Sequence, residues 1–271
     1  MNDKGGVLHD LFGHPGGDGV ARFYDDLAQH YHLLFDDWER SLRRQGQVLD
    51  RLIAEVAGTG SKEILDAACG IGTQALGLAL LGHRLRGTDL SPVAIARARR
   101  EAARLALDIP FSVADMRMLS GYVAGPFDLV IAVDNALPHL ASEAELTQAL
   151  RELRGLVRPG GWFLASIRDY DKVAAARPRS SEPRVIGGAG GRRVVFQVWD
   201  WREDGSGYRL QQYIVSNEGN LAEARVFSTD YRALGRRELD RALEAAGFAG
   251  PARWIDPPES DFYQPIVMAQ A

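Results

Sequence analysis

Acidic and glycine residues stand where the predicted strands end, which is where side chains can reach a ligand. Asp66 ends the first apolar segment, Gly70 and Gly72 follow in the turn, and Asp89 ends the second apolar segment. Glycines in such a turn let the backbone approach a bound nucleoside without a Cβ clash. The carboxylate of Asp89 could accept hydrogen bonds from both hydroxyls of a ribose. We expect a nucleoside site here, with a plain helix cap as the alternative role of Asp89.

The same stretch also fits a dinucleotide fingerprint. Residues 70–75 read GIGTQA, a form of the G-x-G-x-x-A pattern with an acid about twenty residues further on. After the third predicted strand, Asp115 could accept the adenine amino group and Met116 could pack on the ring. A pyrophosphate would lie beside Asp66, whereas an adenosyl sulfonium is cationic and suits an acidic crevice. We favour the sulfonium and keep NAD as the alternative.

Polar residues also follow the fourth predicted strand. The segment 127–133 has the length and β-branched content of a buried strand, and Asp134 and Asn135 come directly after it. Open α/β sheets hold their ligands at the carboxyl ends of strands, so these residues either cap a loop or form the floor of a crevice. Loop capping accounts for Asp134. We expect Asn135 at the crevice, with His139 beside it if a helical turn begins there.

Short apolar segments alternate with helical segments between residues 61 and 170. This rhythm predicts right-handed crossovers and a parallel, doubly wound sheet that forms the cofactor-binding core. Strands are expected at 63–68, 83–89, 110–115, 127–133 and 161–167, and helices at 73–82, 91–106 and 143–161.

Four further segments surround this core. Residues 1–19 are glycine-rich and expected to be flexible, and 20–60 have the periodicity of amphipathic helices, expected to form a lid. Residues 171–234 contain three segments typical of antiparallel strands joined by turns, which predicts an inserted substrate cap. Residues 235–271 are expected to complete the core with a helix that Gly247 ends and two strands.

Aromatic residues are dense in the helical lid. Tyr24, Tyr31, Phe35 and Trp38 lie within fifteen residues of one another. They could pack the helices onto the core, or they could cover a ligand.

Composition narrows the class of protein. The chain has 271 residues and a formal net charge of -4, which argues against nucleic acid as a partner. One cysteine, Cys69, excludes an intramolecular disulfide and a cysteine-based zinc site, and we assign no metal site. The chain shows no signal-peptide pattern at its start and no run of eighteen apolar residues, so we expect a cytoplasmic protein without a membrane partner.

The chain resembles the class I S-adenosylmethionine-dependent methyltransferases through LDAACGIGT, GTDLS, VADM and RPGGWFLAS. The resemblance implies S-adenosylmethionine as the cofactor and S-adenosylhomocysteine as its product. It also implies a seven-stranded sheet whose last strand is antiparallel to the others. Ala68, Leu90 and Val133 stand beside these motifs, and we expect them to line the cofactor pocket together with the lid tyrosines Tyr24 and Tyr31.

More narrowly, the chain resembles the glycine and sarcosine N-methyltransferases through YDDLAQHYHLLFDDWERSLRRQ, CGIGTQALGLALLG, DNALPHL and SIRDYD. This resemblance implies that Arg168 holds the substrate carboxylate and that Asn135 assists. It also implies that Trp38 and Arg44 hold the methionyl part of the cofactor. The planar guanidinium of Arg168 suits a carboxylate, although a surface ion pair is the alternative.

Methyl transfer to an amine is an in-line displacement in which positioning and exclusion of water supply most of the effect. An amino acid nitrogen must first lose a proton, and His139 could take it, hold the cofactor, or simply pack. Tyr208 and Tyr213 could complete the acceptor pocket or pack across strands. We expect glycine, sarcosine or a similarly small amine as the acceptor. A larger natural-product acceptor, an NAD oxidoreductase and a non-catalytic cofactor-binding protein are the alternatives, and the oligomeric state stays open.

Overall fold

A seven-stranded sheet forms the core of the computed structural model, which describes residues 17–188, 191–218 and 221–271. Most of the segment predicted to be flexible, 1–19, lies outside these ranges. The strand order is β10-β11-β5-β4-β1-β2-β3. The strands are β1 (Glu63–Asp66), β2 (Arg84–Asp89), β3 (Phe111–Val113), β4 (Phe127–Ala132), β5 (Val157–Ser166), β10 (Ala249–Ile255) and β11 (Ile266–Gln270).

The direction of the strands confirms the predicted fold. Strands β1 to β5 pair in parallel, while β11 runs antiparallel to both β5 and β10. The central strands are apolar along their length because helices cover both faces of the sheet. Side chains alternate between two buried clusters, so that Leu65 and Val130 face one layer of helices while Ile64 and Leu129 face the other.

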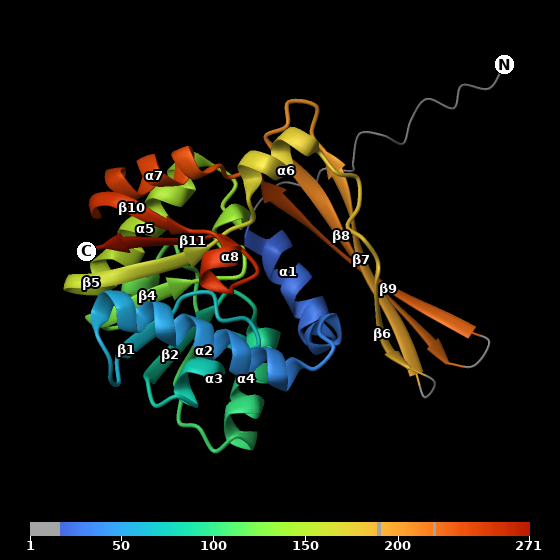
Figure 1. Cartoon of the computed structure of the whole chain (residues 1–271), viewed down its shortest axis with the longest axis horizontal. Helices are drawn as coiled ribbons and strands as arrows, with labels where there is room; N and C mark the ends of the chain where they lie inside the picture. The colour runs from blue at the N-terminus through green and yellow to red at the C-terminus, as the bar shows by residue number, and fades with distance from the viewer. Residues whose placement is uncertain (1–16, 189–190, 219–220) are drawn as a thin grey trace.

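Figure 1 shows the two helical layers. Helices α5 (Glu143–Leu156) and α7 (Arg236–Ala245) cover one face, and α2 (Trp38–Ala57), α3 (Thr73–Ala79) and α4 (Pro92–Arg104) cover the other. Helix α2 buries Leu42, Leu49 and Ile53 in this layer and is therefore part of the core, although the sequence pattern placed it in the lid. Helix α1 (Gly17–Ala28) and the short 3-10 helix η1 (Tyr31–Leu34) lie against the cap, and η3 (Leu137–His139) contacts β9. The other short elements are η2 (Leu119–Gly121), α6 (Tyr170–Ala176) and α8 (Pro257–Ser260).

The inserted cap is a second, antiparallel sheet in the order β6-β7-β8-β9. Its strands are β6 (Arg184–Gly188), β7 (Gly191–Trp201), β8 (Gly207–Glu218) and β9 (Leu221–Arg232). Strands β7, β8 and β9 match predicted strands. Strand β6 was not predicted, because it is short and contains glycine. Helix α1 lies between this sheet and the core and contacts both α4 and β9 (Figure 1). In the described ranges, no helix is long and apolar enough to cross a membrane.

Two glycines allow the close packing of α2 on α3, the helix that follows the glycine turn. A Cβ on Gly77 would lie 2.5 Å from the carbonyl oxygen of Leu42, and one on Gly46 would lie 2.5 Å from the carbonyl carbon of Gly77. Both neighbours are backbone atoms, so the helices would have to separate to admit a methyl group.

We predict that Gly77→Ala lowers the free energy of unfolding by about 1–3 kcal/mol, the usual cost of overpacking. Gly155→Ala is the matched control, because it also lies in a helix but a Cβ there meets nothing within 4 Å. The control should stabilise the protein by up to about 1 kcal/mol through helix propensity. Urea unfolding midpoints of the two variants check this, and equal effects would contradict the close packing.

Candidate active site

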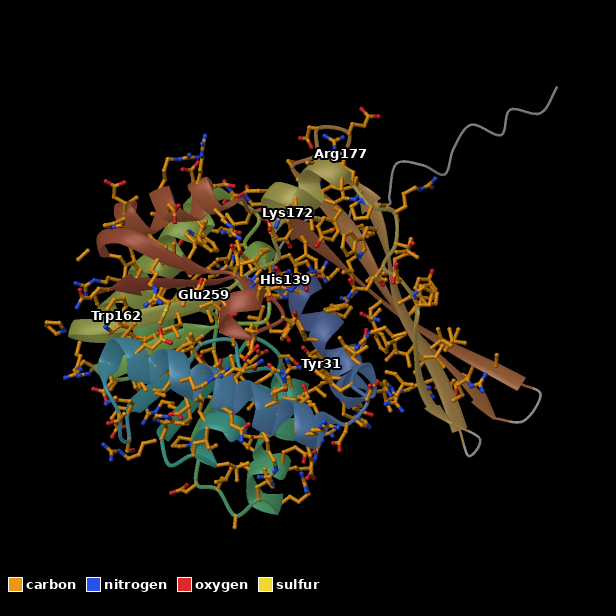
Figure 2. The ribbon with its side chains drawn as sticks, in the orientation of Figure 1. Tyr31, His139, Trp162, Lys172, Arg177 and Glu259 are labelled. Carbon is orange, nitrogen blue, oxygen red and sulfur yellow. The ribbon has the colours of Figure 1, made fainter. Side chains whose placement is uncertain are left out.

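Two cavities meet at the carboxyl ends of the core strands, beneath the cap. The first, here called the sheet-end cavity, has a volume of about 430 Å³ and lies over the glycine turn and the ends of β2 to β4. The second, here called the cap cavity, has a volume of about 510 Å³ and lies between the end of β5 and the cap. The two share the side chains of Tyr24, Tyr31, Asp134 and Tyr231. Figure 2 shows Tyr31 and His139 at this junction between core and cap.

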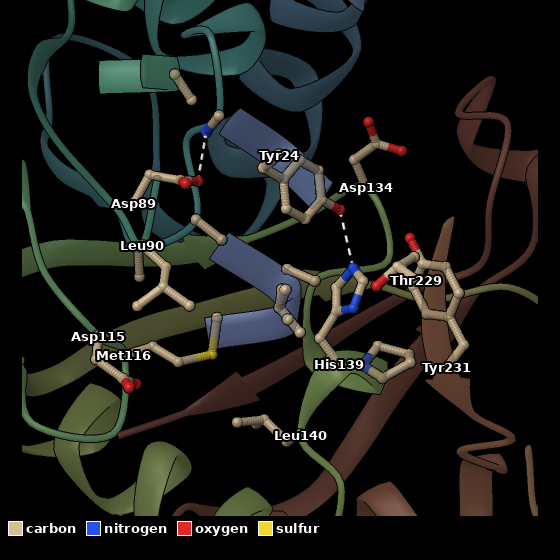
Figure 3. Close-up of a pocket in the computed structure, with 18 of the residues that line it drawn as sticks. Tyr24, Asp89, Leu90, Asp115, Met116, Asp134, His139, Leu140, Thr229 and Tyr231 are labelled. Atoms are coloured by element: carbon tan, nitrogen blue, oxygen red, sulfur yellow. Dashed lines mark hydrogen bonds between the residues drawn. The ribbon is translucent and has the colours of Figure 1, made fainter. Parts of the chain in front are cut away.

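Asp89 lies in the sheet-end cavity with its carboxylate held by the backbone (Figure 3). It accepts hydrogen bonds from the N–H groups of Gly70, at 2.8 Å, and Ser91, at 2.9 Å. Each oxygen keeps a lone pair for a further donor. Burial raises the pKa of the Asp89 carboxyl above its usual value. The predicted residues Ala68, Leu90 and Val133 line the same cavity.

The two glycines of the turn differ in their surroundings. Gly70 (φ 52°) lines the cavity, and a Cβ there would meet nothing within 4 Å. Gly72 (φ 92°) begins α3 behind the turn and does not line the cavity. Asp66 is also set back from the cavity: burial raises its pKa to about 7, and its Oδ2 has no hydrogen-bond partner among the described residues. Asp66 and Gly72 were expected to line the cavity. In the structure they shape the turn behind it instead.

Asp115 and Met116 line the other end of the sheet-end cavity, as the nucleoside prediction requires. Arg117, which the sequence reasoning missed, holds both carboxylate oxygens of Asp115 at 2.6–3.0 Å and also contacts Glu145 at 2.7 Å. Burial alone would raise the pKa of Asp115, but the hydrogen bonds from Arg117 outweigh it and the pKa lies below its usual value. Figure 3 shows the side chain of Met116 pointing into the cavity.

His139 lies on the sheet-end side of the junction, in η3. Its Nε2 is 2.9 Å from the hydroxyl of Tyr24, and its ring lies 4.2 Å from that of Tyr231. Burial lowers the pKa of His139 to about 3, so the imidazole is neutral at pH 7. A base with so low a pKa is a poor acceptor for the proton of an ammonium, so this environment disfavours the general-base role of His139. The packing and cofactor-holding alternatives are compatible with this position.

Asp134 lies in the wall between the cavities, not in a solvent-facing loop cap. Its carboxylate accepts a hydrogen bond from the Tyr31 hydroxyl at 2.5 Å and another from the Tyr263 hydroxyl. Its backbone is left-handed (φ 61°), and that of Asn135 is as well (φ 65°). Loop capping alone therefore does not account for Asp134, because its carboxylate lines both cavities.

Asn135 connects the ends of two core strands. Its Oδ1 accepts a hydrogen bond from the backbone N–H of Arg168 at 3.0 Å, and its Nδ2 donates one to the Tyr170 hydroxyl at 3.0 Å. The side chain is buried and borders the cap cavity. Asn135 thus holds Arg168 in place through the backbone.

Arg168 brings a positive charge to the cap cavity. Its guanidinium donates to the Tyr208 hydroxyl at 2.8 Å and to Gln197 Oε1 at 3.0 Å, and it lies over the rings of Trp199 and Tyr231. All of these partners are neutral, and the ion pairs seen within 17–188, 191–218 and 221–271 do not include Arg168. The surface ion pair is therefore not formed, and a charge held by neutral groups suits an anionic ligand.

Four predicted contacts are placed differently by the structure. Tyr208 is fully buried and supports Arg168 without lining either cavity, while Tyr213 points to the opposite face of β8 and stacks on Phe196. Trp38 is buried in the core and donates a hydrogen bond to Thr73, which does line the sheet-end cavity. Arg44 borders the cap cavity instead of the sheet-end cavity, so it does not contact a cofactor there.

Two tyrosines of the junction were not predicted. Tyr231 pairs with Tyr208 across β8 and β9, so alternation along β9 was a signal for it. Tyr263 comes from the segment that follows α8, and no pattern marked it.

Comparison with known proteins agrees with this geometry. Residues 64–161 match the family model described as a methyltransferase domain. Glycine/sarcosine N-methyltransferase of Parasynechococcus marenigrum is 30% identical over 151 residues, which are 56% of this chain and 52% of that protein. The enzyme of the same name from Halorhodospira halochloris is 27% identical over 156 residues, 58% of this chain and 54% of that protein. The chain thus spans about half the length of these curated relatives.

Solved structures share the fold over most of the chain. DesVI of Streptomyces venezuelae superposes with a TM-score of 0.75 at 19% identity, covering 90% of this chain and 98% of that one. An S-adenosylmethionine-bound amino pentose methyltransferase from Micromonospora echinaspora gives 0.69 at 17% identity, covering 85% and 91%. With the strand order and the glycine turn described above, these matches show that residues 64–161 are a methyltransferase domain, on a chain with the fold of the class I S-adenosylmethionine-dependent methyltransferases.

Proposed function

We propose that the protein transfers a methyl group from S-adenosylmethionine to the nitrogen of a small-molecule amine that carries a carboxylate. The observation that carries this proposal is the junction of two cavities, one containing Asp89 and Met116 beyond the ends of β2 and β3, the other containing Arg168. The names of the two sequence relatives, glycine/sarcosine N-methyltransferases, support nitrogen as the acceptor atom.

The residues of the sheet-end cavity fit S-adenosylmethionine. Asp89 has free lone pairs for ribose hydroxyls, and Met116 offers an apolar contact for adenine. When bound, S-adenosylmethionine supplies a methyl carbon activated by the positive sulfur. The NAD alternative is disfavoured, because Asp66 and Asp89 flank the turn where a pyrophosphate would lie.

The cap cavity supports an acceptor larger than glycine. Its volume of about 510 Å³ is in the range of pockets for drug-sized ligands. The second candidate, a larger natural-product amine, is favoured by this volume. A sugar N-methyltransferase from Streptoalloteichus, the structure of which gives a TM-score of 0.67 at 18% identity, shares the fold. Glycine and sarcosine are the first candidates by sequence similarity, and a panel of acceptors separates the two.

The chain's own residues position and enclose the reacting groups. The shared wall of tyrosines closes the junction, and Arg168 fixes the acceptor by its carboxylate so that its nitrogen faces the sheet-end cavity. Neutral His139 is hydrogen-bonded to Tyr24. Both side chains line the cavity in which the cofactor would bind. Orientation and exclusion of water supply the rate enhancement, since the leaving group needs no protonation.

We predict that Asp89→Ala weakens binding of S-adenosylmethionine and S-adenosylhomocysteine by about 10- to 100-fold, the value of one or two hydrogen bonds to a charged group. Isothermal calorimetry measures the affinity, and thermal unfolding confirms that the variant is folded. Asp204→Ala, in the turn between β7 and β8, is the control and should bind normally. Unchanged affinity in Asp89→Ala would refute the cofactor assignment.

For the acceptor, we predict turnover with methyl-labelled donor in a panel of glycine, sarcosine, leucine and phenylalanine, each tested beside the amine that lacks its carboxylate. Arg168→Ala should raise KM for the carboxylate-bearing acceptors by about 10- to 100-fold, the loss of a charge-assisted contact, and leave the plain amines unchanged. Arg253→Ala, which removes a surface pair with Glu55, is the control. Amino acid turnover indifferent to Arg168→Ala would refute the carboxylate role, and binding without turnover would favour a non-catalytic protein.

A further inference from the structure

Asp134 is the carboxylate that faces both cavities. Four residues within the described ranges line both, namely Tyr24, Tyr31, Tyr231 and Asp134, and Asp134 is the only carboxylate among them. Because a methyl group must pass from the sheet-end cavity to the cap cavity, the acceptor nitrogen must lie at this wall. The acidic group that faces this nitrogen is then Asp134.

The structure holds this carboxylate in a fixed and strained position. The backbone N–H of Asp134 donates to Ser166 Oγ at 2.7 Å, and that of Asn135 donates to the Ser166 carbonyl at 3.0 Å. Two successive non-glycine residues with left-handed backbone are uncommon, and such outliers cluster at active sites. Tyr31 and Tyr263 hold one oxygen each, yet a carboxylate has about four lone pairs, so two remain for a ligand.

The charges around Asp134 match a zwitterion. Arg168 lies close enough for its charge to favour the ionised form of Asp134, and both border the cap cavity. A ligand with an ammonium and a carboxylate can satisfy the two residues at once. An anionic ligand such as acetate, or a neutral ligand, would leave Asp134 without a cationic partner.

We propose that Asp134 binds the acceptor's ammonium group and takes its proton before methyl transfer, so that the acceptor is a zwitterion held between Asp134 and Arg168. This assignment rests on the proposed N-methyltransferase function. One N–H bond of the ammonium breaks and an O–H bond forms on Asp134. The amine lone pair then forms the N–C bond while the C–S bond breaks and its electron pair stays on sulfur. The products are an N-methylammonium and a neutral thioether, and Asp134 returns its proton to water.

Asp134 is also the only carboxyl among the groups that make up this wall in the described ranges. Tyr24, Tyr31, Tyr231 and Tyr263 face it, and burial raises the pKa of each, to about 12 for Tyr231 and well above 10.0 for the others. Arg168 stays charged throughout. Burial raises the pKa of Asp134 above 3.8, although the hydrogen bonds from Tyr263 and Tyr31 and the charge of Arg168 oppose this. A carboxylate with a raised pKa is a better proton acceptor than one on the surface.

The test is the dependence of kcat/KM on pH for the fastest acceptor of the panel. In the wild-type protein, the reacting pair is ionised Asp134 and the ammonium, so kcat/KM should be flat between their two pKa values. In Asp134→Asn, only free amine can react, so kcat/KM should rise tenfold per pH unit up to the pKa of the acceptor. At pH 7 the loss should be about 10²- to 10⁴-fold. Asp204→Asn, which keeps its turn hydrogen bond to Ser206, is the matched control.

Two further measurements separate the explanations. If Asp134 were instead the counter-ion of the sulfonium, Asp134→Asn would weaken S-adenosylmethionine binding but not that of neutral S-adenosylhomocysteine, and this would overturn the proposal. A flat profile retained in Asp134→Asn would also overturn it, while leaving the proposed function intact. A panel without any turnover would overturn both.

Tyr263→Phe gives a second variant in case Asp134→Asn does not fold, since it removes only the hydroxyl group that donates to Asp134. Its hydrogen bond favours the ionised carboxylate, so its loss should raise the pKa of Asp134. The acid limb of the wild-type profile should therefore move to higher pH with little change in the plateau. An unmoved acid limb would contradict the assignment.

Discussion

Three hydrogen bonds between the ends of β4 and β5 determine the geometry of both cavities. The N–H groups of Asp134 and Asn135 bind Ser166, and the side chain of Asn135 binds the backbone of Arg168. Ser166 in turn donates to Gln264 at the end of the chain, at 2.9 Å. Because adjacent parallel strands end at the same edge of a sheet, this link places the partly buried carboxylate of Asp134 near the partly buried guanidinium of Arg168. A zwitterionic acceptor, as proposed here, would have to match their separation.

Burial is the physical reason why the site residues have unusual protonation. The same enclosure keeps His139 neutral and makes Asp66 and Asp134 harder to ionise. A cationic cofactor reverses part of this effect for the carboxyls and strengthens it for the imidazole. The site is therefore acidic in composition, but the state of each group depends on which ligand is present.

The sequence patterns predicted the fold, for reasons that are local. Period-two and helical periodicity located the core strands and helices, and the glycines after the first strand indicated the turn at Gly70. Other features depend on geometry that a single segment does not encode. Tyr208 and Tyr213 lie on opposite faces of β8, and the sequence does not show which face meets the core. The direction of the Asp134 side chain depends on its left-handed backbone. Tyr263 reaches the junction from 129 residues further along the chain, which no local pattern reveals.

Tyr231 belongs to β9 and lines both cavities, and helix α1 is packed against that strand. A movement of the cap that widens one cavity must therefore displace a wall of the other. For the proposed methyl transfer, the donor and acceptor sites would therefore share a movable wall, so that opening one site also changes the shape of the other.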